Sequence, residues 1–467
     1  MSSRNTTDVC YDLAIIGAGP AGMAAAAEAG QLGLATVLID EQEEAGGQIY
    51  RAIERAPLAD EGILGSDYYK GRSLLKAMQA SHTDYLPGTT VWDVEDDLTL
   101  NVSHHGRSRQ VRARRLLIAT GAQERPVPFT GWTLPGVMTC GAAQVLLKNS
   151  ALVPSAPLVL AGSGPLMLLV ASQLSYAGVP IKALLDTTPR ENYFRAARYS
   201  PGALRNLKLL LKGVGLLRTL KRSGVPHITG VESLRAESGK DDHLDKVYYR
   251  RKGADHELDC RSLLVHQGVV PNVQLTRALE LKHRWNEQQQ CWNPHADVWG
   301  ETSRAGIFVA GDSSGIAGAQ AAEEAGRLSV LQIAKQLGQL EEDTRNKRAV
   351  PIRRRLGPHQ AIRPFLDVLY QPARPFLIPE DDTIVCRCEE ITAGELRSIA
   401  DAGCQGPNQA KAFSRAGMGP CQGRLCGLTV SQVLAERNNQ SIDAVGYYHI
   451  RPPIKPLTIG ELADIAN

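Results

Sequence analysis

The sequence has no run of about 18 uncharged apolar residues, so it offers no candidate for a membrane-spanning helix. Its start, Met1–Cys10, is polar, whereas an export signal needs a basic start and then an apolar stretch. Charge of one sign is not in excess either, because the formal net charge is only +3. We therefore expect a cytoplasmic protein that does not bind nucleic acid and contacts membranes at most peripherally.

Cysteine is scarce for a disulfide-stabilised protein. The 467 residues contain nine cysteines, an odd number, and several of them lie together near residues 386–426. This distribution favours a reducing compartment and a metal site over a secreted disulfide framework. The hydrophobic content of 43% is that of an ordinary globular protein, and the length predicts about three folding units.

A strand, a glycine-rich turn, a helix and a second strand are predicted over residues 12–40. The turn reads Gly17-Ala18-Gly19-Pro20-Ala21-Gly22 and precedes an alanine-rich segment. Its glycines permit the tight turn, the approach of backbone to a pyrophosphate, and close packing of helix on strand. Asp40 ends the second strand, where a carboxylate can bind an adenosine ribose. The pattern predicts a dinucleotide-binding unit.

A second copy of this unit begins at Leu158. Its turn reads Gly162-Ser163-Gly164-Pro165-Leu166-Met167, and its second strand ends at Asp186. Met167 replaces the third glycine, so the copy is either a nucleotide site or a relic that only packs. If it is occupied, Asp186 favours NAD(H) over NADP, because a carboxylate repels a 2′-phosphate.

These motifs resemble the two-dinucleotide-fold flavoproteins that include glutathione and thioredoxin reductases. Three further segments match that family, namely Gly46-Gly47-Gln48, Ile118–Ala122 and Gly306–Asp312. The resemblance implies an α/β fold with FAD at the first site and the second domain inserted into the first. The implied FAD residues are Gly17, Ala18, Gly19, Pro20, Ala21, Gly22, Asp40, Glu41, Gly46, Gly47, Gln48, Arg51, Val91, Ala119, Thr120, Gly121, Gly311 and Asp312.

The cysteine pair that disulfide reductases of this fold carry beside the flavin is missing. Cys140 is the first cysteine after Gly46-Gly47, and it has no partner two or four residues away. We therefore do not expect thiol reduction. His266 ends a predicted strand and is interpreted as structural, so the catalytic residues stay unknown.

Four cysteines near the end form two close pairs. One residue separates Cys386 from Cys388, and 32 residues separate Cys388 from the second pair, Cys421 and Cys426. Four thiolates in two pairs suit a [2Fe-2S] cluster, and the C-x-C spacing is tighter than structural zinc usually has. Thr392 and Glu395 predict a capping box that opens a helix over 393–402.

The cysteine module resembles the bacterioferritin-associated-ferredoxin-like domain. The simplest version of that domain ends in C-x-x-C, whereas four residues separate Cys421 from Cys426 here. This longer spacing, together with the segments Gly46–Arg51 and Arg451–Pro456, resembles the α (A) subunits of opine oxidases, hydroxyproline dehydrogenases and dye-linked proline dehydrogenases. The expected division is a discontinuous FAD domain at 1–125 and 290–340, a second nucleotide-type domain at 126–289, and a basic, proline-rich linker at 341–380. The [2Fe-2S] domain is expected at 381–437 and a tail at 438–467.

The resemblance implies an electron relay. A β subunit with its own FAD would oxidise the C–N bond of an amino or imino acid, and this chain would pass the electrons through FAD and [2Fe-2S] to a respiratory acceptor. FMN at a subunit interface and a small ferredoxin-like γ subunit are further expectations. Two alternatives stay open: an NAD(P)H-dependent reductase and a non-catalytic assembly scaffold. The segment 190–222, with nine Lys or Arg and one acid, predicts amphipathic surface helices, with docking of a partner subunit and then adsorption to an anionic membrane surface as the alternatives.

Overall fold

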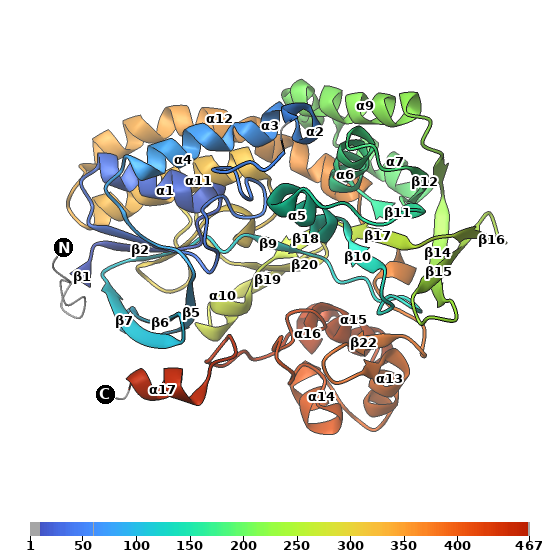
Figure 1. Cartoon of the computed structure of the whole chain (residues 1–467). Helices are drawn as coiled ribbons and strands as arrows, with labels where there is room; N and C mark the ends of the chain where they lie inside the picture. The colour runs from blue at the N-terminus through green and yellow to red at the C-terminus, as the bar shows by residue number, and fades with distance from the viewer. Residues whose placement is uncertain (1–9, 59, 466–467) are drawn as a thin grey trace.

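A computed structural model describes residues 10–58 and 60–465 (Figure 1). The polar start of the chain, on which the expectation of no export signal depends, lies mostly outside the described residues. Two five-stranded parallel sheets form the centres of the two large domains, and a small helical domain follows at the C-terminal end of the described chain. Among the described residues, no helix is long and apolar enough to cross a membrane.

The first parallel sheet is five-stranded and carries helices on one face (Figure 1). Its strands, in spatial order, are β21 (Ile307–Val309), β8 (Leu116–Ile118), β2 (Leu13–Ile16), β3 (Thr36–Ile39) and β4 (Asp84–Leu86). The helices of this domain are α1 (Pro20–Gln31), α2 (Glu61–Leu64), α3 (Ser66–Tyr69), α4 (Gly71–Gln79), α11 (Ala319–Gln336) and α12 (Glu342–Leu369). The opposite face carries a four-stranded sheet of β1 (Cys10–Tyr11), β7 (Arg107–Ala113), β6 (Thr99–His104) and β5 (Thr89–Val94).

Small residues allow the helical layer to lie close to the sheet. Every residue of β2 is buried, as expected for a strand covered on both faces. Helix α1 is alanine-rich, and a Cβ atom added at Gly326 of α11 would lie 2.2 Å from the carbonyl oxygen of Ala21. The two helices therefore approach each other at a distance that larger side chains would prevent.

The second parallel sheet belongs to the inserted domain. Its strands, in spatial order, are β10 (Val137–Thr139), β17 (Ser262–Gln267), β11 (Leu158–Ser163), β12 (Ile181–Asp186) and β13 (His227–Thr229). Helices of this domain are α5 (Cys140–Ser150), α6 (Pro165–Tyr176), α7 (Arg190–Ala197), α8 (Ser200–Ala203) and α9 (Leu207–Arg222). An antiparallel sheet follows, made of β14 (Val231–Ser238), β15 (Leu244–Arg251) and β16 (Ala254–Asp259).

Two short antiparallel strands join the domains. They are β9 (Ala122–Glu124) and β18 (Val269–Pro271), which pair Gln123 with Val270. The chain then returns to the first domain through α10 (Gln274–Ala278), β19 (His283–Asn286) and β20 (Cys291–Pro294). The predicted α/β class with two dinucleotide-type units is confirmed.

The predicted linker at 341–380 is wrong over most of its length, because residues 342–369 form the 28-residue helix α12. Three prolines lie inside it, and each costs a helix about 3 kcal/mol. Burial of Ala349, Ile352 and Leu356 against α11 offsets part of that cost. Arg355 of α12 also pairs with Glu324 of α11 at 2.8 Å. Tertiary packing therefore holds a helix that local sequence disfavours.

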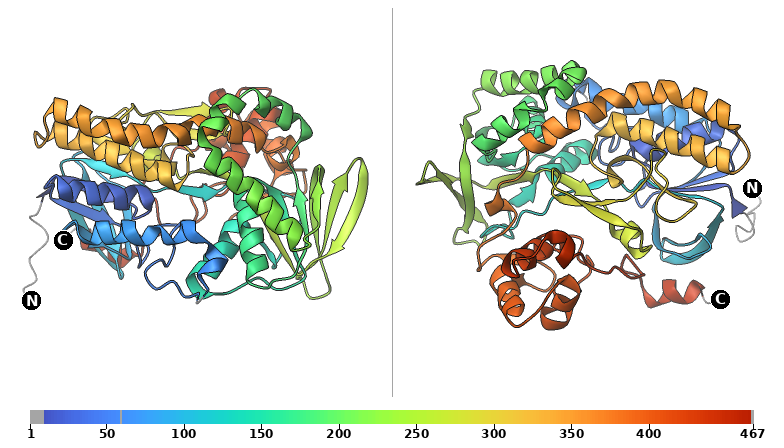
Figure 2. Two further views of the ribbon diagram at one scale, coloured as in Figure 1. Left: turned by 90° about the horizontal axis from the view of Figure 1, so that it is seen from above. Right: turned by 180° about the vertical axis from the view of Figure 1, so that it is seen from behind.

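The C-terminal domain is small and mostly helical (Figure 2). It contains β22 (Ile384–Cys386), β23 (Ile391–Thr392), α13 (Ala393–Asp401), α14 (Pro407–Ser414), α15 (Gly427–Arg437) and α16 (Ile442–Val445). The capping box of Thr392 and Glu395 is confirmed. Leu396, Val430 and Leu434 belong to its buried core.

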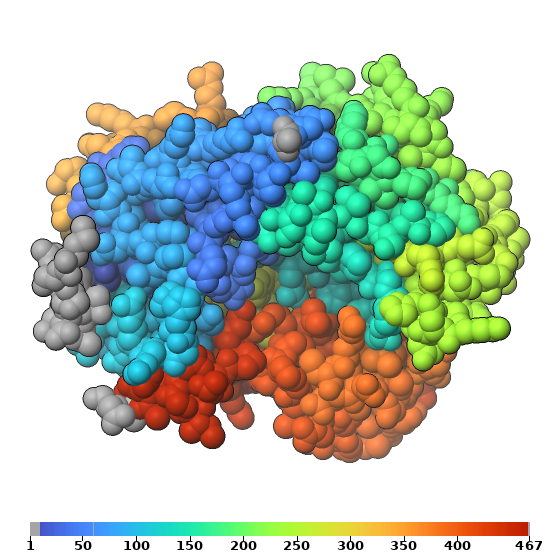
Figure 3. Space-filling view, viewed as in Figure 1, coloured from blue at the N-terminus to red at the C-terminus, as the bar shows by residue number. Residues whose placement is uncertain are grey.

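A tail runs from this domain back to the first domain and ends in α17 (Ile459–Ile465) beside β7 (Figure 2). The amide of Ile454 donates to the carbonyl oxygen of Trp92 at 2.9 Å. Lys455 pairs with Glu41 at 2.5 Å. The space-filling view shows a hollow between the C-terminal domain and the body of the molecule (Figure 3).

Candidate functional site

The first glycine turn leaves no room for side chains. Gly17 has a φ of +104°, and a Cβ atom there would lie 2.5 Å from the carbonyl oxygen of Ala119. A Cβ atom at Gly22 would lie 1.8 Å from the carbonyl oxygen of Gly17. Helix α1 therefore begins at Pro20, directly after the turn, with Gly19 as its N-cap. A glycine turn that leads straight into a helix N-terminus is the geometry of a pyrophosphate site.

Asp40 closes the other side of this turn. Its Oδ2 accepts a hydrogen bond from the amide of Ala18 at 2.5 Å, and its Oδ1 accepts one from Gln42 at 2.7 Å. Burial raises the pKa of Asp40, while both backbone amides favour the charged form. The carboxylate is thus fixed beside the glycine turn, where it can accept ribose hydroxyls.

Other residues predicted for FAD lie around Asp40. Arg51 donates to Gln42 at 2.5 Å, and Glu41 is paired with Lys455 of the tail. Val91 is buried in β5, the strand that follows the loop after β4. The amide of Thr89 donates to the carbonyl oxygen of Asp40 at 2.8 Å, so β5 begins at the adenosine end of the predicted site.

The Gly46-Gly47 segment packs against the glycine turn. A Cβ atom at Gly47 would lie 2.8 Å from the Cα of Gly19. The following residues are held by Lys148 of α5, whose Nζ donates to the carbonyl oxygens of Gln48 at 3.0 Å and Ile49 at 2.9 Å. Burial lowers the pKa of Lys148 to about 7. Sequence reasoning missed Lys148, because its partners lie about 100 residues away and no local motif marks it.

The remaining segments predicted for FAD also converge. Asn272 of the inter-domain connection donates its amide to the carbonyl oxygen of Gly121 at 3.0 Å, and Thr120 donates to Asn272 at 3.4 Å. Asp312 accepts from the amides of Ala317 at 2.8 Å and Gly318 at 2.9 Å, just before α11. The structure therefore brings the predicted residues to the carboxyl ends of β2, β3, β8 and β21.

The second glycine turn is built differently. Asp186 accepts from the amide of Thr188 at 2.9 Å and lies 3.1 Å from Nε2 of His227, rather than binding back to its own turn. Gly162 and Gly164 have φ values of +147° and +110°. Met167 is buried within α6, at the position of the third glycine.

Two side chains from elsewhere lie against this second turn. The imidazole of His266 would be 3.6 Å from a Cβ atom at Gly164, and its Nδ1 lies 2.6 Å from Oε1 of Glu124. His266 is therefore buried and paired, as its structural interpretation predicts. Ser163 donates to the carbonyl oxygen of Tyr370, which follows α12, at 3.5 Å. Both contacts join segments far apart in the chain, so no local motif marks them.

The four predicted cluster cysteines lie in two pairs. The thiol of Cys426 hydrogen-bonds Cys386 and lowers the pKa of Cys386 to about 6. Cys388 and Cys421 also hydrogen-bond each other. Cys386 and Cys426 are buried, whereas Cys388 is exposed. Among residues 10–58 and 60–465, no group of three or more His, Cys, Asp or Glu side chains is arranged so that it could hold a metal ion.

Two thiol pairs suit a binuclear cluster, because each iron takes two protein sulfurs. Close packing holds the segments that carry them. A Cβ atom at Gly419 would lie 2.2 Å from Cβ of Cys388, and one at Gly417 would lie 2.4 Å from the ring of Tyr448. Tyr448 donates to the carbonyl oxygen of Ala416 at 2.9 Å. Tyr448 is a further residue that sequence reasoning missed.

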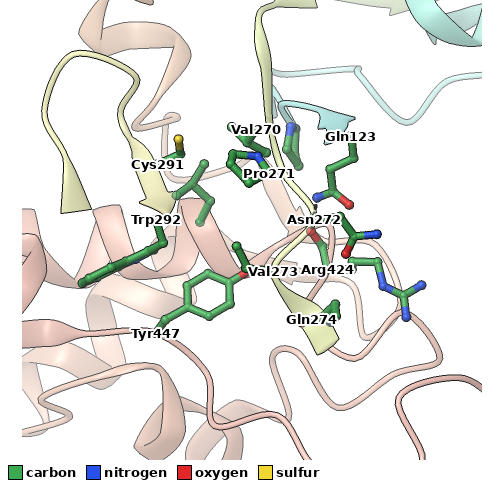
Figure 4. Close-up of a pocket in the computed structure, with 12 residues that line it drawn as sticks. Gln123, Val270, Pro271, Asn272, Val273, Gln274, Cys291, Trp292, Arg424 and Tyr447 are labelled. Carbon is green, nitrogen blue, oxygen red and sulfur yellow. Dashed lines mark hydrogen bonds between the residues drawn. The ribbon is translucent and has the colours of Figure 1, made fainter. Parts of the chain in front are cut away.

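The loop between Cys421 and Cys426, here called the cysteine loop, contacts β9, one of the two strands that join the large domains, and the start of α10. Nε2 of Gln123 donates to the carbonyl oxygen of Arg424 at 2.8 Å, and Nε2 of Gln274 donates to that of Gln422 at 2.8 Å. A pocket lies at this junction, and Trp292 and Tyr447 form its opposite side (Figure 4). Gln123 lies two residues after Gly121, so the loop contacts the chain directly beside the predicted flavin segment.

Comparison with family models matches residues 11–326 to the pyridine nucleotide-disulphide oxidoreductases and 380–465 to the sarcosine oxidase A3 domain. The opine oxidase A subunit from Rhizobium meliloti is 42% identical over 464 residues, which cover 98% of this chain and 99% of that protein. Its counterpart from Agrobacterium tumefaciens is 44% identical, covering 98% and 92%. This chain belongs to the family of opine oxidase A subunits.

The chain is also similar to a subunit of another enzyme and to a solved dehydrogenase structure. The hydrogen cyanide synthase subunit HcnB of Pseudomonas aeruginosa is 33% identical, covering 97% of this chain and 98% of that protein. L-proline dehydrogenase from P. horikoshii shares the fold with a TM-score of 0.70 at 20% identity, over 97% of this chain and 79% of that one. The resemblance drawn from the motifs is confirmed, and the chain is an oxidoreductase subunit.

Proposed function

We propose that this chain is the electron-transfer subunit of a heteromeric flavin-dependent amino- or imino-acid dehydrogenase, of the opine or hydroxyproline/proline type. FAD would bind at the first glycine turn, and a [2Fe-2S] cluster would bind Cys386, Cys388, Cys421 and Cys426. A flavin exchanges two electrons and such a cluster one, so together they convert paired electrons into single ones. The amine-oxidising centre would reside in a partner β subunit.

The contact of the cysteine loop with Gln123 and Gln274 carries this proposal. The same connection that holds Gly121 through Asn272 also binds the loop between Cys421 and Cys426. The chain's own residues would thereby hold the two proposed cofactor sites in one fixed arrangement. Gly46–Ile49, held by Lys148, would orient the flavin, while Cys386 and Cys426 would keep water from the inner side of the cluster.

The NAD(P)H-reductase alternative receives less support from the second site. Met167 takes the place of the third glycine, and the imidazole of His266 lies beside Gly164. Both side chains reduce the space in which the second glycine turn could bind a pyrophosphate. Asp186 is already engaged by His227. We propose that electrons enter from a partner protein in the cytoplasm, and that an interface FMN, a γ subunit and a respiratory acceptor complete the system.

An anaerobic optical titration tests the proposal. The purified chain is treated with NADH and then with dithionite, and flavin and cluster absorbance are followed. We expect no bleaching by NADH and full bleaching by dithionite. Stoichiometric bleaching by NADH would instead establish the reductase function.

Iron content supplies the matched test of the cluster. Cys388→Ala is expected to lose the bound iron, whereas Cys404→Ala is expected to retain it, because Cys404 donates to the carbonyl oxygen of Gly406 and lies outside the two pairs. Equal iron in both variants would show that Cys388 does not bind the cluster, and no iron in the unaltered chain would favour the scaffold alternative.

A further inference from the structure

Helices α7, α8 and α9 form one helical segment of the second domain; in Figure 1, α9 lies along the top of this domain and α7 lies below it. Between residues 190 and 222 it carries nine Lys or Arg and only one acid, Glu191. In a folded chain whose net charge is +3, this is a strong local excess of positive charge. We call these residues, 190–222, the basic ridge.

Large apolar side chains are exposed on the same ridge. Phe194 is 82% exposed and Leu211 is 68% exposed. The full set of exposed large apolar residues here is Tyr193, Phe194, Leu204, Leu207, Leu209, Leu211, Val214 and Leu217. Five of these residues lie in α9. Exposed apolar surface concentrated on one helix marks a binding face, whereas single exposed leucines are ordinary.

The spacing in α9 puts apolar residues on one outward face. Leu207, Leu211 and Val214 are four and three residues apart and therefore lie on one side of the helix. The opposite side holds Leu220, the one buried residue of α9. Asn206 caps the helix by accepting a hydrogen bond from the amide of Leu209 at 3.3 Å. The helix is thus anchored through one face and presents the other to its surroundings.

Cations border this apolar face along its length. Lys208, Lys221 and Arg222 are exposed, and α9 contains no acidic residue to neutralise them. Lys212 is paired with Asp67 at 2.6 Å, so it helps to fix α9 to the first domain. An amphipathic helix with leucines on one side and Lys or Arg beside them is the pattern that lies in the headgroup region of a membrane.

We infer that the basic ridge is a docking surface for an anionic phospholipid membrane. Exposed apolar side chains would enter the boundary between headgroups and acyl chains, while the flanking cations would bind lipid phosphates. The contact is peripheral, since no helix among the described residues is suited to span a bilayer.

Vesicle co-sedimentation tests it. The purified full chain is mixed with vesicles of phosphatidylglycerol and phosphatidylcholine, or of phosphatidylcholine alone. We expect binding to the anionic vesicles, at least about tenfold weaker binding to the neutral ones, and loss of binding as salt is raised. Failure to bind anionic vesicles at low salt would overturn the inference.

A matched pair of variants distinguishes vesicle binding through the basic ridge from non-specific binding through exposed apolar residues elsewhere. The ridge variant Phe194→Ser/Leu211→Ser/Val214→Ser is expected to bind at least about tenfold more weakly, although its charge is unchanged. The control variant Val298→Ser/Phe413→Ser/Ile459→Ser removes equally exposed apolar residues elsewhere and is expected to bind like the unaltered chain. Equal binding by the two variants would overturn the inference.

The charge variant Lys208→Gln/Lys221→Gln/Arg222→Gln keeps the apolar face and is expected to lose selectivity for anionic vesicles. Circular dichroism and thermal melting check that each variant folds. The complex isolated with its partner subunits is then tested in the same assay. Binding by the complex supports the inference, whereas binding by the free chain alone would show that a protein partner covers the ridge.

Discussion

The two glycine turns of this chain share a motif and differ in their surroundings. In the first, Asp40 binds back to the amide of Ala18, and Gly22 lets α1 lie against Gly17. In the second, Asp186 is turned toward His227, Met167 takes the third glycine position, and His266 lies over Gly164. The glycines fix the backbone of both turns, but the residues around them determine what each turn can bind.

The largest expected effect follows from filling the first turn. Gly22→Val places methyl groups where even a Cβ atom would lie 1.8 Å from the carbonyl oxygen of Gly17, so α1 must move away from the turn. We expect at least about a hundredfold loss of FAD affinity, since the pyrophosphate needs that close approach. Flavin absorbance per chain after gel filtration measures it. Met167→Val, at the matching position of the second turn, is the control and should keep its flavin.

Removing the charge at the end of the second strand should have a smaller effect. Asp40→Asn loses the charge-assisted hydrogen bonds from Ala18 and Gln42, which are roughly twice as strong as neutral ones. We expect about a tenfold loss of FAD affinity, measured by titrating the flavin-free protein with FAD. Asp186→Asn should leave FAD affinity unchanged. An equal loss in both variants would mean that the two sites do not differ as described.

Opening the second turn should make it more like the first. The double variant Met167→Gly/His266→Ala restores the third glycine and removes the imidazole beside Gly164. We expect about fivefold tighter binding of NADH, measured by quenching of tryptophan fluorescence. Met167→Leu keeps the bulk and should bind NADH as weakly as the unaltered chain. No gain in the double variant would show that other residues close the site.

The smallest expected effect concerns Lys148. Burial lowers its pKa from 10.5 to about 7 in the folded chain. Between those pH values the unfolded chain binds a proton that the folded chain does not, so stability rises with pH in that window. Lys148→Met lacks this contribution. The Tm of the unaltered chain should therefore rise by a few degrees relative to Lys148→Met between pH 7 and pH 10, whereas Lys208→Met, at an exposed site, should follow the unaltered chain.

Local sequence patterns predicted much of this molecule. The two glycine turns, the strands that precede them and the Thr392 capping box depend on residues within a few positions of one another. Such local patterns predict the structure well, because the residues that interact, such as Thr392 and Glu395, belong to the same short segment. The two-domain α/β architecture followed from their repetition.

Long-range packing accounts for what the sequence did not predict. Three prolines argued against a helix at 342–369, but the helix forms and buries Ile352 and Leu356 against α11. Lys148, His266 and Gln123 act on segments about 100 to 300 residues away. A single sequence carries no sign of such pairings, so these residues emerge only from the fold.

The C-terminal domain is tied to both large domains at once. The indole of Trp132 donates to the carbonyl oxygen of Ile384 at 2.7 Å, while Arg424 donates to that of Ile454, whose own amide binds Trp92. A domain that is fixed by contacts on two sides cannot rotate between two different docking positions. Electron transfer between the proposed centres would then need no diffusive rotation, and its rate should be insensitive to the viscosity of the solvent.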